Sequence, residues 1–149
     1  MTIAPAAQRI ITQFNMQPHP EGGYYAETWR ASNEGRATGT CIYFLLTERQ
    51  ASHWHRVDAT EIWFYHAGAP LILSTSPTDA GPAQDQYLTA DLSLGTPQVI
   101  IPENHWQAAR STEDWTLEAA PCHRGLSLRD LLSLPPGLTY RAPSLQLAG

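Results

Sequence analysis

Two histidines in the first half of the chain have the spacing of a metal-binding or ligand-binding pair. His53 and His55 occur in the run SHWHR, and residues i and i+2 of an extended strand project from the same face. Glu61 opens the next run, EIWFYHAG, and if the chain turns at 57–60 its carboxylate returns beside the imidazoles. Such a set suits zinc, iron, manganese or nickel. The alternatives are that both histidines are satisfied core residues and that Glu61 is a structural hydrogen-bond acceptor.

A second candidate group lies in the later run PQVIIPENHWQ. His105 and Gln107 share a face if this segment is a regular strand, so either or both line the same pocket as the first pair. A glutamine amide is a weaker ligand than an imidazole, and a site completed by Gln107 binds metal less tightly than one completed by His105. The sequence leaves both alternatives open.

Aromatic side chains alternate along the run that Glu61 begins. Trp63 and Tyr65 share the face of Glu61, and Trp106 follows later in the chain. The three aromatic residues are either barrel-wall side chains or a surface that stacks on a sugar or a base. Tyr65 is also a candidate general acid that acts with His53 or His55 as the base.

Three further residues are candidate ligand contacts. Arg56 either pairs with Asp58 in a turn or binds an anionic substrate by bidentate hydrogen bonds. Glu21 and Tyr25 flank the pair Gly22-Gly23, where we expect a turn or a close backbone approach. They either edge the mouth of the pocket or pack an interface between subunits.

The remaining histidines and the cysteines are expected to be structural. His19, His66 and His123 have no partner visible in the sequence, so we place them on the surface or in structural roles. Cys41 and Cys122 do not have metal-type spacing and are expected to be reduced thiols. Cys122 lacks the orienting third group that a nucleophile requires.

Composition narrows the possible partners and chemistry. The formal charge is −5, and no basic run offers counterion release, which excludes a nucleic-acid or anionic-membrane partner. All 9 basic residues are arginines, so a lysine Schiff base or lysine general base is excluded. No segment has the apolar length of a membrane span, and no signal peptide opens the chain, so we expect a cytoplasmic protein that binds a small molecule.

The elements that must position these residues are mostly short strands. We expect one domain over 1–149, with a core at about 14–130 and a tail at 131–149. Apolar residues at helical spacing predict a helix over 5–15, and 126–134 forms a last strand or a short helix. An aromatic, alternating stretch within 18–32 predicts a strand, and 76–85 predicts an exposed loop. Further β-like runs cover 38–46, 51–56, 61–66, 70–74, 86–90, 98–102 and 115–119. The pattern predicts an all-β sandwich, jelly roll or barrel.

The runs quoted above resemble the cupin superfamily. Its first motif, a His-x-His pair followed by a glutamate and a glycine, matches His53, His55, Glu61 and Gly68, with the gap before the glutamate one residue longer than usual. More specifically, PHPEGGYYAET, SHWHRVDATEIWFYHAGAPL and PQVIIPENHWQAAR resemble the uncharacterised family called DUF985 or cupin_5. The resemblance implies a cupin (RmlC-like) double-stranded β-helix, or jelly-roll barrel, with a polar and aromatic pocket, and a homodimer.

The chain departs from the second motif of the superfamily, which reads Pro-x-Gly-x-x-His. Counting from Pro102, Asn104 stands where the glycine belongs and Gln107 stands where the ligand histidine belongs. Either Gln107 acts as the ligand or His105 supplies it from a shifted register.

Three functional hypotheses follow. In the first, a divalent metal held by His53, His55 and Glu61, with His105 or Gln107, polarises an oxygen-rich substrate. In the second, the chain is a metal-independent enzyme similar to the cupin sugar-nucleotide epimerases, with a histidine base and a tyrosine acid. In the third, it binds or senses a small metabolite without catalysis.

Overall fold

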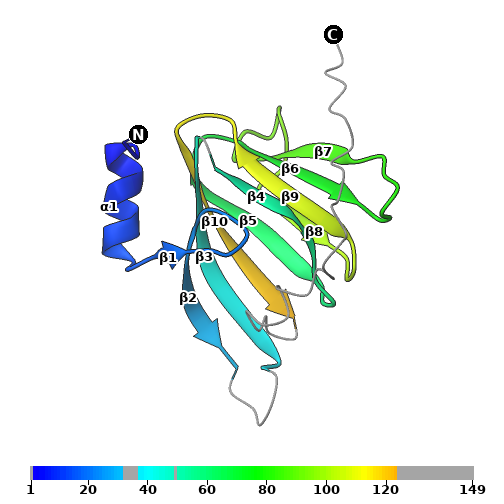
Figure 1. Cartoon of the computed structure of the whole chain (residues 1–149). Helices are drawn as coiled ribbons and strands as arrows, with labels where there is room; N and C mark the ends of the chain where they lie inside the picture. Colours follow the sequence, from blue (N-terminus) through cyan, green and yellow to red (C-terminus); the bar gives the residue numbers. More distant parts are fainter. Residues whose placement is uncertain (1, 32–36, 49, 124–149) are drawn as a thin grey trace.

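Short alternating strands dominate the chain, and they fold as two antiparallel sheets that face one another (Figure 1). The structure is a computed structural model that describes residues 2–31, 37–48 and 50–123. The described elements are α1 (Pro5–Gln13), β1 (Gln17–Pro18), β2 (Tyr24–Arg30), β3 (Gly39–Thr47), β4 (Ala51–Arg56), β5 (Glu61–Gly68), β6 (Leu71–Ser76), β7 (Gln84–Leu88), β8 (Gln98–Ile101), β9 (Trp106–Ser111) and β10 (Trp115–His123).

The first sheet has the strand order β1-β2-β3-β10-β5-β8, and the second has the order β4-β9-β6-β7. All neighbouring strands of both sheets pair antiparallel, and partners within a sheet are mostly far apart in sequence, as β3 and β10 are. Such crossed connections between two sheets are typical of a jelly roll. The predicted all-β fold with one short N-terminal helix is confirmed.

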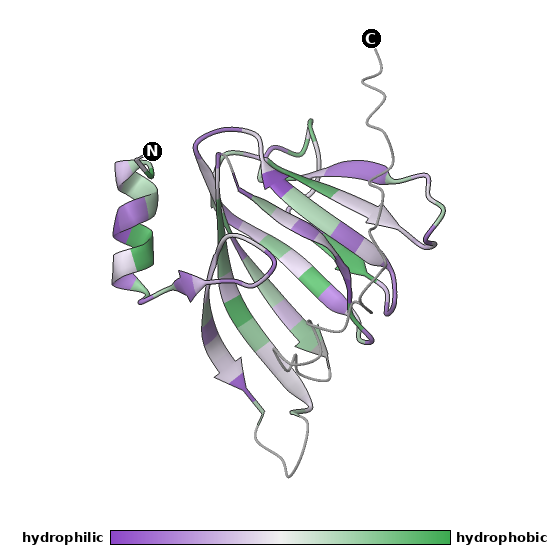
Figure 2. Cartoon of the chain, in the orientation of Figure 1, coloured by the Kyte–Doolittle hydropathy of each residue, from purple (hydrophilic) through white to green (hydrophobic). Residues whose placement is uncertain are grey.

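The main core lies between the sheets. Strands of both sheets contribute buried apolar residues to it, and hydrophobic and hydrophilic residues alternate along several of the strands (Figure 2). Its buried members are Phe44, Leu46, Trp63, Leu71, Leu73, Leu88, Val99, Ile101 and Ala109. A sheet pair that buries one face in this way has its register fixed, because a shift by one residue would expose the apolar set.

Helix α1 covers the outer face of the six-stranded sheet. Its apolar stripe packs Ala7, Ile10 and Ile11 against Leu45 and Leu117, whose neighbours in sequence point into the barrel. The helix begins at a proline, which tolerates the first helical position, and ends before Phe14. The predicted helix is therefore confirmed, two residues shorter at its C-terminal end than expected. Among the described residues, no helix has the length and apolar character of a membrane span.

Strand β9 is absent from the set of strands that the sequence predicts. Its sequence WQAARS holds two alanines and a glutamine, which have weak β-propensity, and it does not alternate clearly. The segment is nonetheless a strand because it pairs on both sides, with β4 and with β6. Tertiary pairing outweighs local propensity here. The predicted helix or strand at 126–134 and the predicted tail at 131–149 lie outside the described residues.

Gly22 brings the loop between β1 and β2 against β4. Its φ is +102°, and a Cβ atom on it would lie 2.1 Å from the carbonyl oxygen of Ala51. In the same contact, the backbone N–H of His53 donates to the carbonyl of Glu21 at 2.7 Å. The expected close backbone approach at the two glycines is therefore confirmed, and it places residues 19–23 beside the first histidine segment.

Substitution Gly22→Ala is expected to destabilise the fold by about 2 kcal/mol or more, because it combines a left-handed backbone with a clash against the β4 backbone. The shift in the urea unfolding midpoint measures the effect. Ala80→Gly, in the exposed loop that follows β6, is the control and should change stability by less than about 1 kcal/mol. Equal midpoints for Gly22→Ala and wild type would show that the approach is not required.

Candidate functional site

The two histidines of the SHWHR run do not face the same side of β4. Ser52 pairs with Ala109 and His55 pairs with Gln107, so three steps along β4 match two along β9. This extra residue is a β-bulge. Ser52 and His55 are both buried in the barrel, whereas His53 is exposed. The expectation that His53 and His55 converge on one face is wrong, because the bulge breaks the regular alternation of the strand.

A small inner cavity of about 20 Å³ adjoins His55, and it admits about one water-sized group. Residues from both sheets and from the loop after β1 line it: His19, Ile42, Phe44, Ser52, His55, Glu61, Trp63 and Ala120. His55 and Glu61 are therefore brought together, as predicted. Trp63 also contributes to the wall.

Gln107 forms a bridge between Glu61 and Trp63 across the barrel interior. The indole N–H of Trp63 donates to the amide oxygen of Gln107 at 2.9 Å. The amide nitrogen of Gln107 in turn donates to a carboxylate oxygen of Glu61. An indole can only donate, so the amide oxygen must face Trp63 and the NH₂ group must face Glu61. The orientation of the Gln107 side chain is fixed by these two partners.

Burial raises the pKa of Glu61 to about 7. The hydrogen bonds from Gln107 and Trp63 oppose the rise because they favour the charged carboxylate. A carboxyl group with this pKa exchanges its proton near neutral pH, which suits a general acid or base. Glu61 is therefore both the structural acceptor that the sequence analysis allowed and a chemically competent group.

His55 presents a basic nitrogen toward the interior. Its Nδ1 lies 2.7 Å from the carbonyl oxygen of His53, and a carbonyl only accepts, so Nδ1 carries the proton and Nε2 keeps its lone pair. Burial lowers the pKa of His55, although the hydrogen bond to His53 favours the charged form. The imidazole is thus a neutral acceptor or base.

His19 offers a donor where His55 offers an acceptor, although the sequence analysis placed it on the surface or in a structural role. The backbone N–H of Glu21 donates to its Nδ1 at 3.1 Å, so the neutral ring carries its proton on Nε2. Burial, with the nearby His55, lowers the pKa of His19 to about 4. The ring also makes edge contacts with Tyr25 and Phe44. The signal for this role was the PHPEGG run, whose turn returns the imidazole to the barrel.

Glu118 is a second interior carboxyl group that the sequence analysis did not single out. It lies on β10, opposite Phe44 of β3 and Tyr65 of β5, and its side chain is 0 % exposed. Within the part of the chain that the structure describes, neither of its carboxyl oxygens has a hydrogen-bond partner. Burial, together with the negative charge of Glu61, raises the pKa of Glu118 well above its usual value. The signal was a glutamate within the run LEAAPC, whose other residues are apolar.

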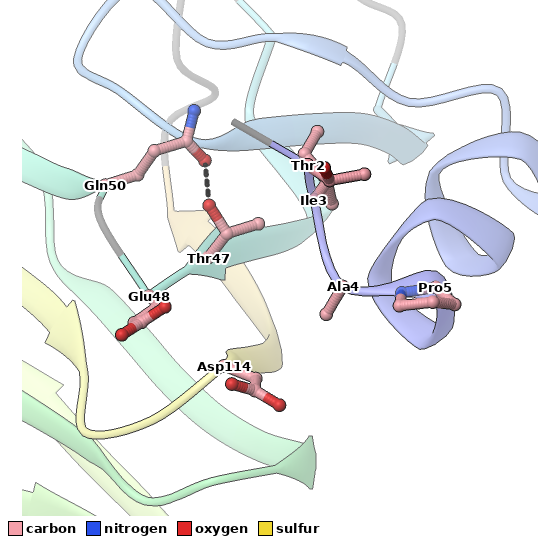
Figure 3. A pocket seen from close by; sticks show the side chains of 8 residues that line it. All are labelled: Thr2, Ile3, Ala4, Pro5, Thr47, Glu48, Gln50 and Asp114. Carbon is pink, nitrogen blue, oxygen red and sulfur yellow. Dashed lines mark hydrogen bonds between the residues drawn. The ribbon is translucent and has the colours of Figure 1, made fainter.

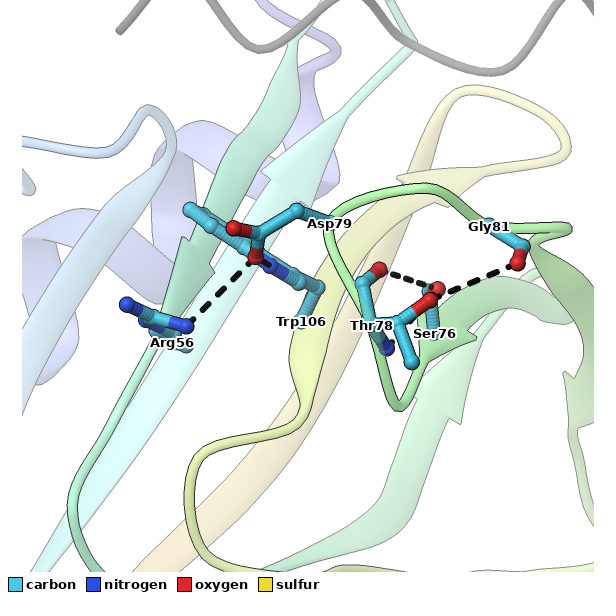
Figure 4. A network of polar contacts seen from close by, with 6 residues as sticks. All are labelled: Arg56, Ser76, Thr78, Asp79, Gly81 and Trp106. Atoms are coloured by element: carbon cyan, nitrogen blue, oxygen red, sulfur yellow. Dashed lines mark hydrogen bonds and ion pairs between the residues drawn. The ribbon is translucent and has the colours of Figure 1, made fainter.

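Arg56 and Trp106 hold the loop at 77–83 against the outside of the second sheet (Figure 4). The indole N–H of Trp106 donates to a carboxylate oxygen of Asp79 at 2.6 Å, and the Arg56 guanidinium lies 3.5 Å from the same oxygen. The guanidinium carbon also lies 5.0 Å from the centroid of the Trp106 ring. A carboxylate that Arg56 contacts is therefore that of Asp79; the expected pairing with Asp58 or with a ligand stays a prediction.

The other predicted residues lie outside the inner cavity. Tyr65 packs on the core and donates its hydroxyl to the carbonyl of Gly68 at 2.5 Å. Glu21 is half-buried near His53, and burial raises its pKa. His105 precedes β9 and is partly exposed, so Gln107, not His105, occupies the interior position. Asn104 has a φ of +62°, a conformation that favours the glycine of the family motif.

The donor set does not fit a metal held by the His-x-His pair. His53 is exposed, and the oxygen of Gln107 already accepts from Trp63 while its NH₂ group cannot bind a cation. Within residues 2–31, 37–48 and 50–123, no cluster of three or more histidine, cysteine or acidic side chains is arranged to hold a metal ion. His55 Nε2 and Glu61 remain as two neighbouring donors.

A groove of about 520 Å³ lies between the start of the chain and the turn after β3 (Figure 3). Thr2 to Pro5 form one side of it, and Glu48 and Asp114 are on the other. Thr47 donates a hydrogen bond to the side chain of Gln50 at 2.9 Å within it. None of the predicted site residues lines this groove.

Comparisons with known proteins agree with the fold. The family described as Cupin superfamily (DUF985) matches residues 8–131. A hypothetical protein from Leishmania major is similar at 27% identity and a TM-score of 0.76, over 83% of this chain and 84% of that chain. A protein from Shewanella oneidensis is similar at 28% identity and a TM-score of 0.77, over 87% of this chain and 83% of that chain.

More distant structures share the barrel. An oxalate decarboxylase variant from Bacillus subtilis has 11% identity and a TM-score of 0.59, over 79% of this chain and 30% of that chain. At this level of identity the likeness concerns the fold alone. A search of curated proteins gave no match.

The buried Glu61 predicts a defined pH dependence. A carboxyl group whose pKa is raised from 4.5 to about 7 on folding lowers stability as pH rises through that window. Glu61→Gln removes this loss, so its free energy of unfolding relative to wild type should grow by roughly 3 kcal/mol between pH 4.5 and 7, then level off. Urea unfolding across this pH range measures the difference.

Substitution Glu113→Gln, at an exposed position, is the matched control and should track the wild-type curve. The buried neutral side chains of His19 and His55 have the opposite effect, because they make the fold less stable as pH falls. This contribution is present in both proteins, so it cancels in the difference between their free energies of unfolding. A constant offset between Glu61→Gln and wild type over the whole range would contradict a raised pKa at Glu61.

Proposed function

This chain belongs to the DUF985 family of the cupin superfamily, and we propose that it binds a small polar molecule at its barrel, with one polar group of that molecule in the inner cavity. One observation carries the proposal: His19, His55 and Glu61 meet at the inner cavity with fixed and complementary hydrogen-bonding roles. His19 offers an N–H donor, His55 offers a lone pair, and Glu61 is able to do either. Fold alone does not decide function, so the proposal depends on these side chains.

The same groups support proton transfer without a metal. Glu61 exchanges a proton near neutral pH, and His55 holds an unprotonated Nε2 in the same cavity. A general base and a general acid at one site suit an isomerase or epimerase reaction at a carbon next to a carbonyl. The Tyr65 hydroxyl is engaged with the Gly68 carbonyl, so we assign the acid role to Glu61 and not to Tyr65. Binding without turnover remains the alternative function of the same pocket.

The supporting residues hold this arrangement in place. Gln107 orients the carboxyl of Glu61, and the Glu21 backbone orients the ring of His19. We also expect a homodimer, as the family resemblance implies. The apolar side chains of Ile100 on edge strand β8 (60 % exposed) and Leu92 in the connection leading to it (76 % exposed) offer surface that a second copy would cover.

The ligand site predicts specific losses of affinity. A thermal-shift screen of small metabolites should give ligands whose dissociation constants, measured by calorimetry, rise about 10- to 100-fold in His55→Gln and Glu61→Gln, because each loses a buried hydrogen bond to the ligand. His66→Gln is the matched control, since His66 lies on β5 but is exposed. Ligands that bind His55→Gln and wild type equally would place the site elsewhere.

A second test separates this proposal from the metal hypothesis. A divalent metal (Zn, Fe, Mn or Ni) held by His53, His55 and Glu61, with His105 or Gln107, requires all of these donors to face one cavity. His55 and Glu61 line the inner cavity, but His53 is exposed. Untagged protein incubated with each ion and then desalted should retain far less than one ion per chain by elemental analysis. Near-stoichiometric metal that is lost in His53→Ala, but not in His66→Ala, would support the metal hypothesis instead.

A further inference from the structure

The inner cavity reaches toward the surface between two of its lining residues. His19, in the loop between β1 and β2, and Ile42, on β3, are partly exposed, and the other residues of the lining are buried. The cavity itself admits about one water-sized group. A larger ligand therefore places one polar group inside and extends outward past His19 and Ile42.

The polar side chains of the cavity differ in the hydrogen bonds that they offer. The Glu21 N–H donates to Nδ1 of His19, so the neutral ring presents an Nε2–H donor. His55 donates its Nδ1–H to the carbonyl of its own strand and presents an Nε2 lone pair. A carboxylate oxygen of Glu61 accepts from Gln107, and the protonated form of the group has one O–H to donate.

The cavity therefore offers two donors and one acceptor when Glu61 is protonated. Ser52 also contributes a hydroxyl to the lining, but this group rotates to donate or to accept and does not select between ligands. The selective groups are those of His19, His55 and Glu61. A fitting ligand group has the size of one heavy atom, accepts twice and donates once.

We propose that the inner cavity binds the hydroxyl group of a neutral alcohol, whose carbon chain extends past His19 and Ile42. An alcohol oxygen accepts from the His19 ring and from the Glu61 acid, and its hydrogen is donated to His55. This inference rests on the proposed function, because both place one polar group in the same cavity. It adds the chemical class of that group.

Other polar groups satisfy fewer of the three partners. A carboxylate or a carbonyl oxygen only accepts, so it sets a lone pair against Nε2 of His55. An ammonium only donates, so it meets the N–H of His19, and either charged group loses its hydration on entry. A water molecule makes the same three hydrogen bonds as an alcohol. The alcohol replaces it without loss of these bonds and adds apolar contact with Ile42.

The match requires the protonated form of Glu61, so binding depends on pH. The pKa of Glu61 is raised to about 7 by burial. Above this pH its carboxylate is a second acceptor, and an alcohol has only one hydrogen to donate. Among the described residues, the other titratable groups around Glu61 are His19, His55 and Glu118, and burial favours the uncharged form of each. The affinity for an alcohol should therefore fall about 10-fold from pH 6 to pH 8.

The test uses the full chain with isotope-labelled histidine and three probes that share a two-carbon body: ethanol, acetate and ethylammonium. Sodium chloride keeps the ionic strength equal. Proton–nitrogen correlation spectra at pH 6 should show a protonated Nε2 in His19 and a protonated Nδ1 in His55. Ethanol should shift the Nε2 signals of both rings in a saturable way, and acetate and ethylammonium should bind about 10-fold or more weakly. His66, which is exposed on β5, reports any general effect of the probes.

Two variants remove the donor of His19 by different routes. His19→Phe retains a ring against Tyr25 and Phe44, and His19→Asn retains an acceptor for the Glu21 N–H, but neither carries an N–H at the position of Nε2. In both, the affinity for ethanol read from the His55 signal should fall about 10-fold or more. His66→Phe is the matched control and should bind ethanol as wild type does. Thermal midpoints near that of wild type show that the variants are folded.

Several results would overturn the inference. These are the opposite tautomer in His19 or His55, the absence of a saturable ethanol shift in wild type, and acetate or ethylammonium binding as tight as that of ethanol. An ethanol affinity that is equal at pH 6 and pH 8 would overturn the donor role of Glu61. Metabolites that lack a hydroxyl group, yet bind wild type and not His55→Gln, would sink this inference while the proposed function stands.

Discussion

A hydrogen-bonded bridge inside the barrel joins the two sheets at the point where the chemistry is concentrated. Glu61 and Trp63 come from β5 of the six-stranded sheet, and Gln107 comes from β9 of the four-stranded sheet. A buried carboxyl group is costly unless it is hydrogen-bonded, so Glu61 depends on the amide. The amide in turn depends on the indole for its orientation. The same two hydrogen bonds therefore affect the packing of the sheets, the orientation of the site and the pKa of Glu61.

The interior is unusual because it contains several ionisable groups and favours the uncharged form of each. Burial lowers the pKa of His19 and His55 and raises that of Glu61 and Glu118, so each group shifts toward its uncharged form. The cost of desolvation is thus met by protonation state and not by ion pairs, which the described arginines form at the surface. A site of this kind responds to charge on a ligand more strongly than a surface site does, because little solvent screens it.

The sequence predicted the fold better than it predicted the site. Alternating apolar runs and the resemblance to a known family were sufficient for the barrel, since burial of one face fixes both strand identity and register. The site depended on features without a local signal. His19 is placed by a turn that Gly22 permits, and Glu118 is distinguished only by the face it occupies. The role of Gln107 depends on a partner on another strand, which no spacing along the chain reveals.

The bulge in β4 has a consequence for how related chains are compared. Its one extra residue turns His53 outward and leaves His55 inward, although the letters of the His-x-His run are intact. The number of imidazoles inside such a barrel is therefore set by strand length as well as by side-chain identity. Two homologues with the same histidines in an alignment can differ in chemistry through a single insertion or deletion. A shift of register along one strand can therefore change how many of these imidazoles face the interior while both histidines are kept.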